Sequence, residues 1–164
     1  MRQNHSIWAV SLLIGCWAWI GLDRQLLPAA AACDHPESVD QGRREQASKV
    51  CEMIFRHQFK RDIPDSLLRD AQAIFLSIEK QDPSPEFMKR FAKGQKLPVR
   101  PGSEFKEGVG PWLRIDDLEW SDKEAVVVQA SIYVGPVAAE WRRFRLVRRE
   151  CHWVIVEDKL IGVS

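Results

Sequence analysis

The spacing of apolar side chains predicts a long helix at the start of the folded part of the chain. The side chains that recur at three- and four-residue steps are Ala47, Val50, Cys51, Ile54, Phe55 and Gln58, with Phe59 beside them. This spacing gives one buried stripe along a helix of about five turns. Asp40 is placed to cap its start, and the helix is expected to end at residues 62–65, because Pro64 disfavours helical geometry in the residue before it. Residues 66–70 are expected to add a short helical turn.

A short strand and a second helix are predicted next. Residues 73–78 form a brief apolar run with β-branched and aromatic members, which is typical of a buried strand. Ser84 is a good helix cap, Pro85 suits the first helical position, and Gly94 can close the helix in a left-handed conformation. The residues that follow, up to Pro111, are interpreted as a connection over the surface.

Alternating apolar positions predict four strands in the last third of the chain. Their ranges are 112–120, 125–134, 139–149 and 153–160. The connections between them are short, with a tight turn at Glu150 and Cys151, so neighbouring strands are expected to run antiparallel. The predicted fold class is therefore α+β: an N-terminal helix, a short strand and a second helix packed on a curved antiparallel sheet of four C-terminal strands.

The last two of these strands carry a resemblance to a known family. The segment Arg145–Lys159, RLVRRECHWVIVEDK, resembles the closing hairpin of nuclear transport factor two-like domains, and similar hairpins occur in cystatin-like domains. The resemblance implies a cone-shaped sheet around a pocket, which serves catalysis, binding or scaffolding, and the enzymes place an acid with a partnering His, Asp or Tyr inside it. The inward positions expected here are all apolar: Val126, Val128, Ile132, Phe144 and Leu146. The resemblance therefore assigns no catalytic pair to this chain.

Residues 1–32 have the pattern of a targeting segment. Residues 7–22 form an uncharged apolar run that is shorter than the roughly 20 residues needed to span a bilayer. Such a run suits a secretory signal peptide, and residues 27–32, LPAAAA, supply the small side chains of a cleavage site.

Two alternatives for this leader stay open. Residues 13–16, LIGC, resemble a lipobox, in which Cys16 would be lipidated. The other alternative is an uncleaved membrane anchor that ends at Asp23 and Arg24. All three interpretations place the protein outside the cytoplasm, in the periplasm or on the outer face of a membrane. Residues 33–39 are then a linker, and residues 40–164 form a single domain.

The balance of charge limits the classes of partner. The chain has 24 Lys and Arg against 23 Asp and Glu, and without Arg2, Asp23 and Arg24 of the leader the counts are 22 and 22. A neutral domain has no general attraction for nucleic acid or anionic lipid. Five arginines lie within residues 142–149, but the alternation of a strand puts at most three of them on one face. We therefore expect no nucleic-acid partner, and membrane contact only through the leader.

Three cysteines follow the apolar run of the leader: Cys33, Cys51 and Cys151. An oxidising compartment permits one disulfide among them, and spacing does not decide the pairing. We expect Cys51 to be a small buried residue of the first helix. A disulfide from Cys51 to Cys33 or to Cys151 is the alternative.

The sequence assigns no catalytic residue, metal site or cofactor. It contains no glycine-rich phosphate loop and no recognisable serine or cysteine nucleophile motif. Cys33 and His35 are two candidate metal ligands, but a zinc site needs about four, and no second cluster supplies the others. Asp116, Asp117 and Glu119 are expected to form cross-strand charge pairs with the arginines of residues 142–149.

Two functional hypotheses follow from these features. The first is a non-catalytic, exported domain of the cell envelope that binds a protein or a small apolar ligand. Its expected contact residues are Trp112, Trp141, Arg143 and Arg145. The alternative is a pocket enzyme of the nuclear transport factor two-like type, with His57 or Asp158 as the acid–base group.

Overall fold

The computed structural model describes residues 39–136 and 138–164, and these residues form an α+β fold. The helices are α1 (Val39–Asp62), α2 (Asp65–Asp70) and α3 (Pro85–Ala92), with a 3₁₀ turn, η1 (Gly102–Glu104). The strands are β1 (Ile74–Ile78), β2 (Val99–Pro101), β3 (Trp112–Trp120), β4 (Ala125–Gly135), β5 (Ala138–Arg149) and β6 (His152–Val163). β3, β4 and β5 match the predicted strands to within one residue at each end, whereas β6 extends further, to Val163.

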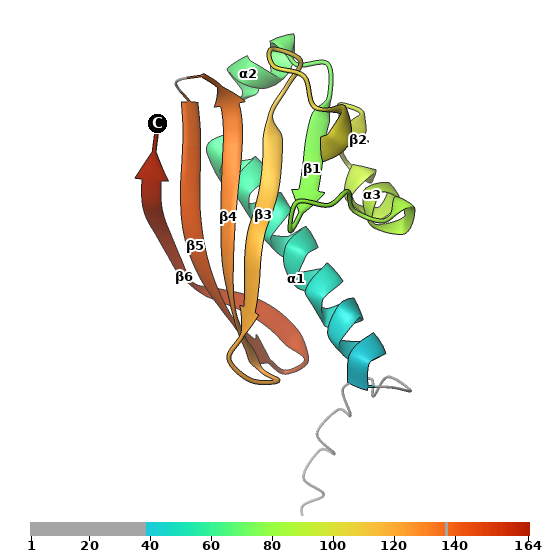
Figure 1. Ribbon diagram of the computed structural model, residues 1–164, viewed down its shortest axis with the longest axis vertical. Helices are drawn as coiled ribbons and strands as arrows, with labels where there is room; N and C mark the ends of the chain where they lie inside the picture. Colours follow the sequence, from blue (N-terminus) through green and yellow to red (C-terminus); the bar gives the residue numbers. More distant parts are fainter. Residues whose placement is uncertain (1–38, 137) are drawn as a thin grey trace, which may run out of the picture. The chain divides into compact units, whose positions relative to one another are not determined.

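All six strands of the described residues belong to one sheet, in the order β2-β1-β3-β4-β5-β6 (Figure 1). The strands from β3 to β6 pair antiparallel with one another, as predicted, but β1 pairs in parallel with both β2 and β3. The prediction of a four-stranded antiparallel sheet was therefore wrong in two respects, since the sheet has six strands and is mixed. Parallel pairing is possible here because α3 and the long connection after it return the chain to the same end of the sheet, which a tight turn cannot do.

α1 crosses one face of the sheet, and its apolar stripe forms the core with that face (Figure 1). Val50, Ile54 and Phe55 are fully buried and belong to one cluster with side chains of β1, β3, β4 and β5. The predicted inward positions are buried in the same cluster: Val126, Val128, Ile132, Phe144 and Leu146. The space between α1 and the sheet is therefore a packed apolar core.

Local sequence features set the ends of several elements. The Phe87 amide donates a hydrogen bond to Ser84 Oγ at 3.2 Å, which confirms the predicted cap of α3. Glu150 and Cys151 have positive φ angles of 49° and 65°, as the tight turn between β5 and β6 requires. The prediction for Asp40 was wrong: α1 begins at Val39, so Asp40 lies within the first turn, where its charge still favours the helix dipole.

The connection between α3 and β3 is held in place by the sheet. It contains β2 and η1, and it runs beside the segment that leads into β1. The Gln72 amide donates to Val109 O at 2.7 Å, and the Phe75 amide donates to Pro111 O at 2.9 Å. These hydrogen bonds fix the position of Trp112 at the start of β3.

Candidate functional site

The four predicted contact residues lie on one face of the sheet, opposite the face that α1 covers. Trp141, Arg143 and Arg145 occupy alternate positions of β5, and Phe144 between them is buried in the core on the other side. The register from β3 through β4 to β5 puts Trp112 on the same side as Trp141. We call this side of the sheet, which carries Trp112, Trp141, Arg143 and Arg145, the open face.

Trp112 holds the connection before β3 against the open face. Its ring stacks on Phe105 with 4.7 Å between centroids, and its indole N–H donates to Ser77 Oγ at 3.0 Å. The guanidinium of Arg114 lies 5.0 Å from the ring centroid. These contacts half-bury the indole and satisfy its N–H. Trp112 therefore stabilises the fold, and only part of its ring is accessible on the open face.

The exposed part of the open face is formed by Trp141, Arg143 and Arg145, which we call the Arg–Trp patch. Both arginines are exposed and Trp141 is half-buried. In the register of β5 and β6, Lys159 lies opposite Arg143, and Glu157 lies opposite Arg145. Within residues 39–136 and 138–164, no carboxylate is within ion-pairing distance of either arginine. The patch therefore carries local positive charge in a domain that is otherwise close to neutral.

The acidic residues of β3 do not neutralise this patch. β4 lies between β3 and β5, so Asp117 and Arg143 both neighbour Gln129 and are two strands apart, which is roughly 10 Å. Asp116 accepts a hydrogen bond from Arg114 Nη2 of its own strand, at 2.6 Å. The predicted cross-strand pairs between these acids and the arginines of β5 were therefore wrong, because β3 and β5 are not neighbours.

A polar cluster lies on the other face, where α1 meets β6. His57 Nε2 is 3.0 Å from Asp158 Oδ2, so the structure joins the two residues of the enzyme hypothesis. Asp158 also accepts hydrogen bonds from Arg61 and, at 3.0 Å, from Arg142 Nη1. The side chains of His57 and Asp158 are 36% and 22% exposed. Sequence reasoning missed both arginines, and the position of Arg61 one helical turn after His57 was the only sign of its role.

The surroundings of His57 favour its neutral form. Its pKa is lowered from the ordinary value of 6.5, first by partial burial and then by the positive charge of Arg61, while Asp62 opposes this effect and Arg142 adds to it. A neutral ring can donate its Nε2–H to Asp158, whose charge is already balanced by two guanidinium groups. We infer that the cluster attaches α1 to β5 and β6.

The lowered pKa of His57 predicts a loss of stability in mild acid. The unfolded chain binds the proton more readily than the folded chain, so the free energy of unfolding should fall as pH drops from about 7.5 to about 5.5. Denaturant titrations at both pH values should show a weaker pH dependence for His57→Gln than for the wild type. His152→Gln makes the same substitution on the exposed β5–β6 turn and controls for the replacement of a histidine as such. Equal pH dependence in wild type and His57→Gln would contradict the inference.

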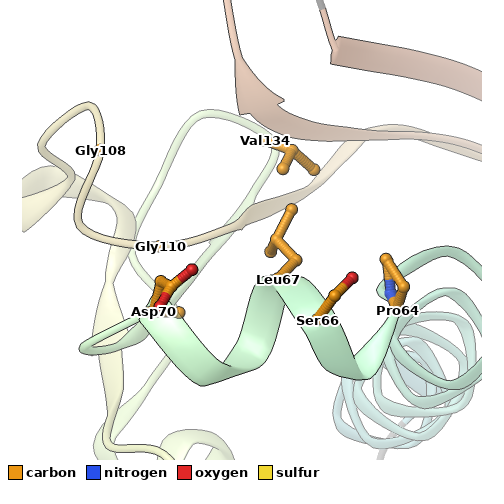
Figure 2. A pocket seen from close by; sticks show the side chains of 8 residues that line it. Pro64, Ser66, Leu67, Asp70, Gly108, Gly110 and Val134 are labelled. Carbon is orange, nitrogen blue, oxygen red and sulfur yellow. The ribbon is translucent and has the colours of Figure 1, made fainter.

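Two shallow pockets open beside α2. The first, of about 390 Å³, lies between α2 and the end of β4, with Leu67 pointing towards Val134 (Figure 2). The second, of about 360 Å³, also contains Pro64, Leu67 and Val134, and it extends to Asp62 and Glu140. Neither member of the histidine–aspartate contact lines either pocket. The acid–base groups of the enzyme hypothesis are therefore separate from both pockets.

The two described cysteines differ in state. Cys51 is free and buried in α1, and burial raises the pKa of its thiol to about 12. Cys151, in the turn between β5 and β6, is disulfide-bonded. The alternatives of a disulfide from Cys51 to Cys33 or to Cys151 were therefore both wrong, because Cys51 is a free cysteine that faces the core.

Residues 1–38, which hold the leader and all but the last residue of the predicted linker, lie outside the described residues, and so do Cys16 and Cys33. The signal-peptide, lipidation and anchor interpretations therefore stay predictions. Among the helices of the described residues, none is long and apolar enough to cross a membrane. The same part of the chain contains no group of three or more His, Cys, Asp or Glu side chains that could bind a metal ion.

Comparison with known proteins identifies no relative. No protein-family model matches the chain, and no curated protein and no solved structure is significantly similar to it. The resemblance to nuclear transport factor two-like and cystatin-like domains stays a hypothesis based on the closing hairpin.

Proposed function

We propose that this protein is a non-catalytic, exported domain of the cell envelope, which binds an acidic segment of another protein on its open face. The observation that supports this most directly is the Arg–Trp patch, where Trp141, Arg143 and Arg145 lie at alternate positions of one strand. Aromatic and arginine side chains are enriched at protein interfaces, and Trp and Arg are enriched among the few residues that carry most of the binding energy. α1 lies on one face of the sheet (Figure 1), and the alternation of β5 puts the patch on the opposite face.

The charges around the patch favour an acidic partner. Arg143 lies opposite Lys159 in the register, and like charges on facing positions of a sheet are destabilising. Carboxylates of a partner would relieve the repulsion, and the planar guanidinium groups can bind them through paired hydrogen bonds. The apolar ring of Trp141 beside them would supply buried area.

Export is supported by two features of the chain. The leader has an uncharged apolar run followed by small residues, as a secretory signal does. Cys151 is disulfide-bonded, and disulfides persist mainly in oxidising compartments such as the periplasm. The proposed partner is therefore also a protein of the envelope.

Site-specific cross-linking in living cells of the source organism tests this proposal. A photoreactive amino acid at Gln129, which is exposed and lies opposite Arg143, should give one defined adduct in the envelope fraction. Mass spectrometry should map the cross-link to a net-acidic segment of the partner. The same photoreactive residue at the exposed position Lys49 of α1 is the control and should not give this adduct.

Charge reversal of the patch gives the second arm of the test. Arg143→Glu/Arg145→Glu should remove the adduct and weaken binding of the identified segment at least about tenfold. Arg44→Glu/Arg69→Glu changes the net charge equally at exposed positions of α1 and α2, and it should leave binding unchanged. Absence of an adduct at Gln129, or equal loss in both double variants, would refute the assignment.

The contact between His57 and Asp158 is the one observation that favours the enzyme alternative. A general base needs a free lone pair that faces a bound substrate. Here both carboxylate oxygens of Asp158 already accept hydrogen bonds, and neither residue lines a pocket. A stabilising role accounts for this cluster without a substrate, and we therefore favour the binding function.

A further inference from the structure

Exposed apolar side chains are concentrated on β6, which forms one edge of the sheet. Every large apolar side chain that is exposed in the described part of the chain lies on this strand, with exposed fractions from 38% to 66%: Val154, Val156, Leu160, Ile161 and Val163. β6 has twelve residues and, among residues 39–136 and 138–164, pairs only with β5, whereas β2, at the other edge, has three residues. A long edge strand presents unpaired backbone N–H and C=O groups to any further strand.

Two bulges in β6 lie on either side of its central segment, Glu157–Leu160, whose register with β5 is continuous. The register with β5 passes over Val156 and Ile161, so each is an extra residue in the strand. Bulges and inward charges commonly prevent edge-to-edge pairing. Here the bulged residues are themselves apolar and exposed. The edge strand therefore exposes apolar side chains both before and after Asp158.

The centre of β6 is self-complementary in charge. Glu157 and Lys159 lie on the open face, and Asp158 between them faces α1. When a second copy of the strand runs antiparallel and is centred on Asp158, Glu157 of each copy lies opposite Lys159 of the other. Both residues of each pair are on the same face, because a twofold axis perpendicular to the sheet preserves the faces. Opposite charges at facing positions stabilise a strand pair.

The remaining positions are compatible with the same register. Val156 and Leu160 flank the charged centre on either side, so pairing of the two strands brings exposed apolar surface of both copies together. The two Asp158 side chains meet near the axis, but each already accepts hydrogen bonds from Arg61 and Arg142 of its own chain. Their negative charges are therefore compensated before the copies meet.

We propose that two copies of this protein form a symmetric dimer by antiparallel pairing of β6 with β6, with Asp158 next to the twofold axis. The pairing joins the two sheets into one and covers the apolar edge of each. Because the axis is perpendicular to the sheet, both open faces point the same way. The dimer thus presents two Arg–Trp patches on one surface, which would increase its avidity for a partner with repeated acidic segments.

Charge exchange at the centre of the strand tests this register. The full-length chain, purified in a mild non-ionic detergent, should sediment as a dimer. Glu157→Lys and Lys159→Glu should each raise the dissociation constant of the dimer at least about tenfold, because each places two like-charge pairs across the interface. The double variant Glu157→Lys/Lys159→Glu should recover the dimer. An equimolar mixture of the two single variants should form a heterodimer, detected by native mass spectrometry.

The controls separate this interface from other contacts. Lys123→Glu makes the same change of charge as Lys159→Glu on the exposed turn between β3 and β4, and it should leave the dimer intact. A monomeric wild type at about 100 μM would overturn the proposal. A dimer that survives both single variants would overturn it as well, since the copies would then pair through another surface. Neither result would alter the cross-linking expected from Gln129, so this proposal and the proposed function can fail separately.

Discussion

Gly110→Ala is expected to lower the free energy of unfolding by more than about 3 kcal/mol, the upper end of the usual cost of overpacking. A Cβ atom at this position would overlap the carbonyl oxygen of Ala73 and lie 3.1 Å from its carbonyl carbon. Both are backbone atoms, so no side-chain rotation can relieve the contact. The two segments would have to move apart.

Hydrogen bonds on either side of Gly110 oppose such a movement. The Gln72 amide donates to Val109 O, and the Phe75 amide donates to Pro111 O. The pairing of β1 with β3 begins directly after these bonds, at Phe75 and Trp112. Separating the segments would therefore break hydrogen bonds and weaken the parallel part of the sheet, which adds to the cost of the clash.

Denaturant titration of the purified full-length chain, followed by tryptophan fluorescence and far-ultraviolet circular dichroism, measures this loss. Gly135→Ala is the matched control, because a Cβ there meets nothing within 4 Å and no left-handed conformation is involved. Its effect should stay within about 1 kcal/mol. Equal stability of Gly110→Ala and the wild type would show that the connection is not packed against the segment before β1.

Features that depend on a few neighbouring residues were predicted well from the sequence. The cap at Ser84 and the tight turn at Glu150 and Cys151 were both confirmed, because each is decided by local backbone chemistry. The apolar stripe of α1 was also confirmed, with Val50 and Ile54 fully buried, since the period of a helix is visible in any sequence. The strand ranges follow from alternation in the same way.

Features that depend on strand order were missed. The sequence does not show that β1 lies between β2 and β3, because parallel pairs are made by long connections whose path leaves no local sign. The same limit explains why Asp117 was expected beside the arginines of β5, from which β4 separates it. The contact between His57 and Asp158 joins α1 to the last strand, and only the folded chain brings these two together.

Of the two candidate surfaces, the arrangement of one could be predicted from the sequence and that of the other could not. The Arg–Trp patch was predictable because Trp141, Arg143 and Arg145 alternate along a strand whose own register is unbroken between them. The apolar edge of β6 was not, because alternation assigns a face to each residue only while the register is continuous. Val156 and Ile161 each interrupt it.

Phe55→Ala is expected to cost about 3–5 kcal/mol of stability, the usual range for removal of a fully buried aromatic ring. Phe55 has no exposed surface. Its ring meets both Phe87 and Phe91 edge-on, with 6.0 Å between centroids in each case. These contacts join α1 to α3. The substitution therefore removes buried apolar area and two aromatic contacts, and it leaves a cavity in the core.

Phe59→Ala is the control for this prediction, because it makes the same substitution one helical turn later, at a half-buried position of α1. Its loss of stability should be clearly smaller, since part of the ring is already in contact with water and the site can collapse more easily. Guanidinium titrations of the two variants give both values under identical conditions. Equal losses of unfolding free energy would show that Phe55 is no more important to the core than Phe59. A larger loss for Phe55→Ala would show that packing on α3 and the sheet, and not helix propensity, holds α1 in place, since both variants make the same substitution in the same helix.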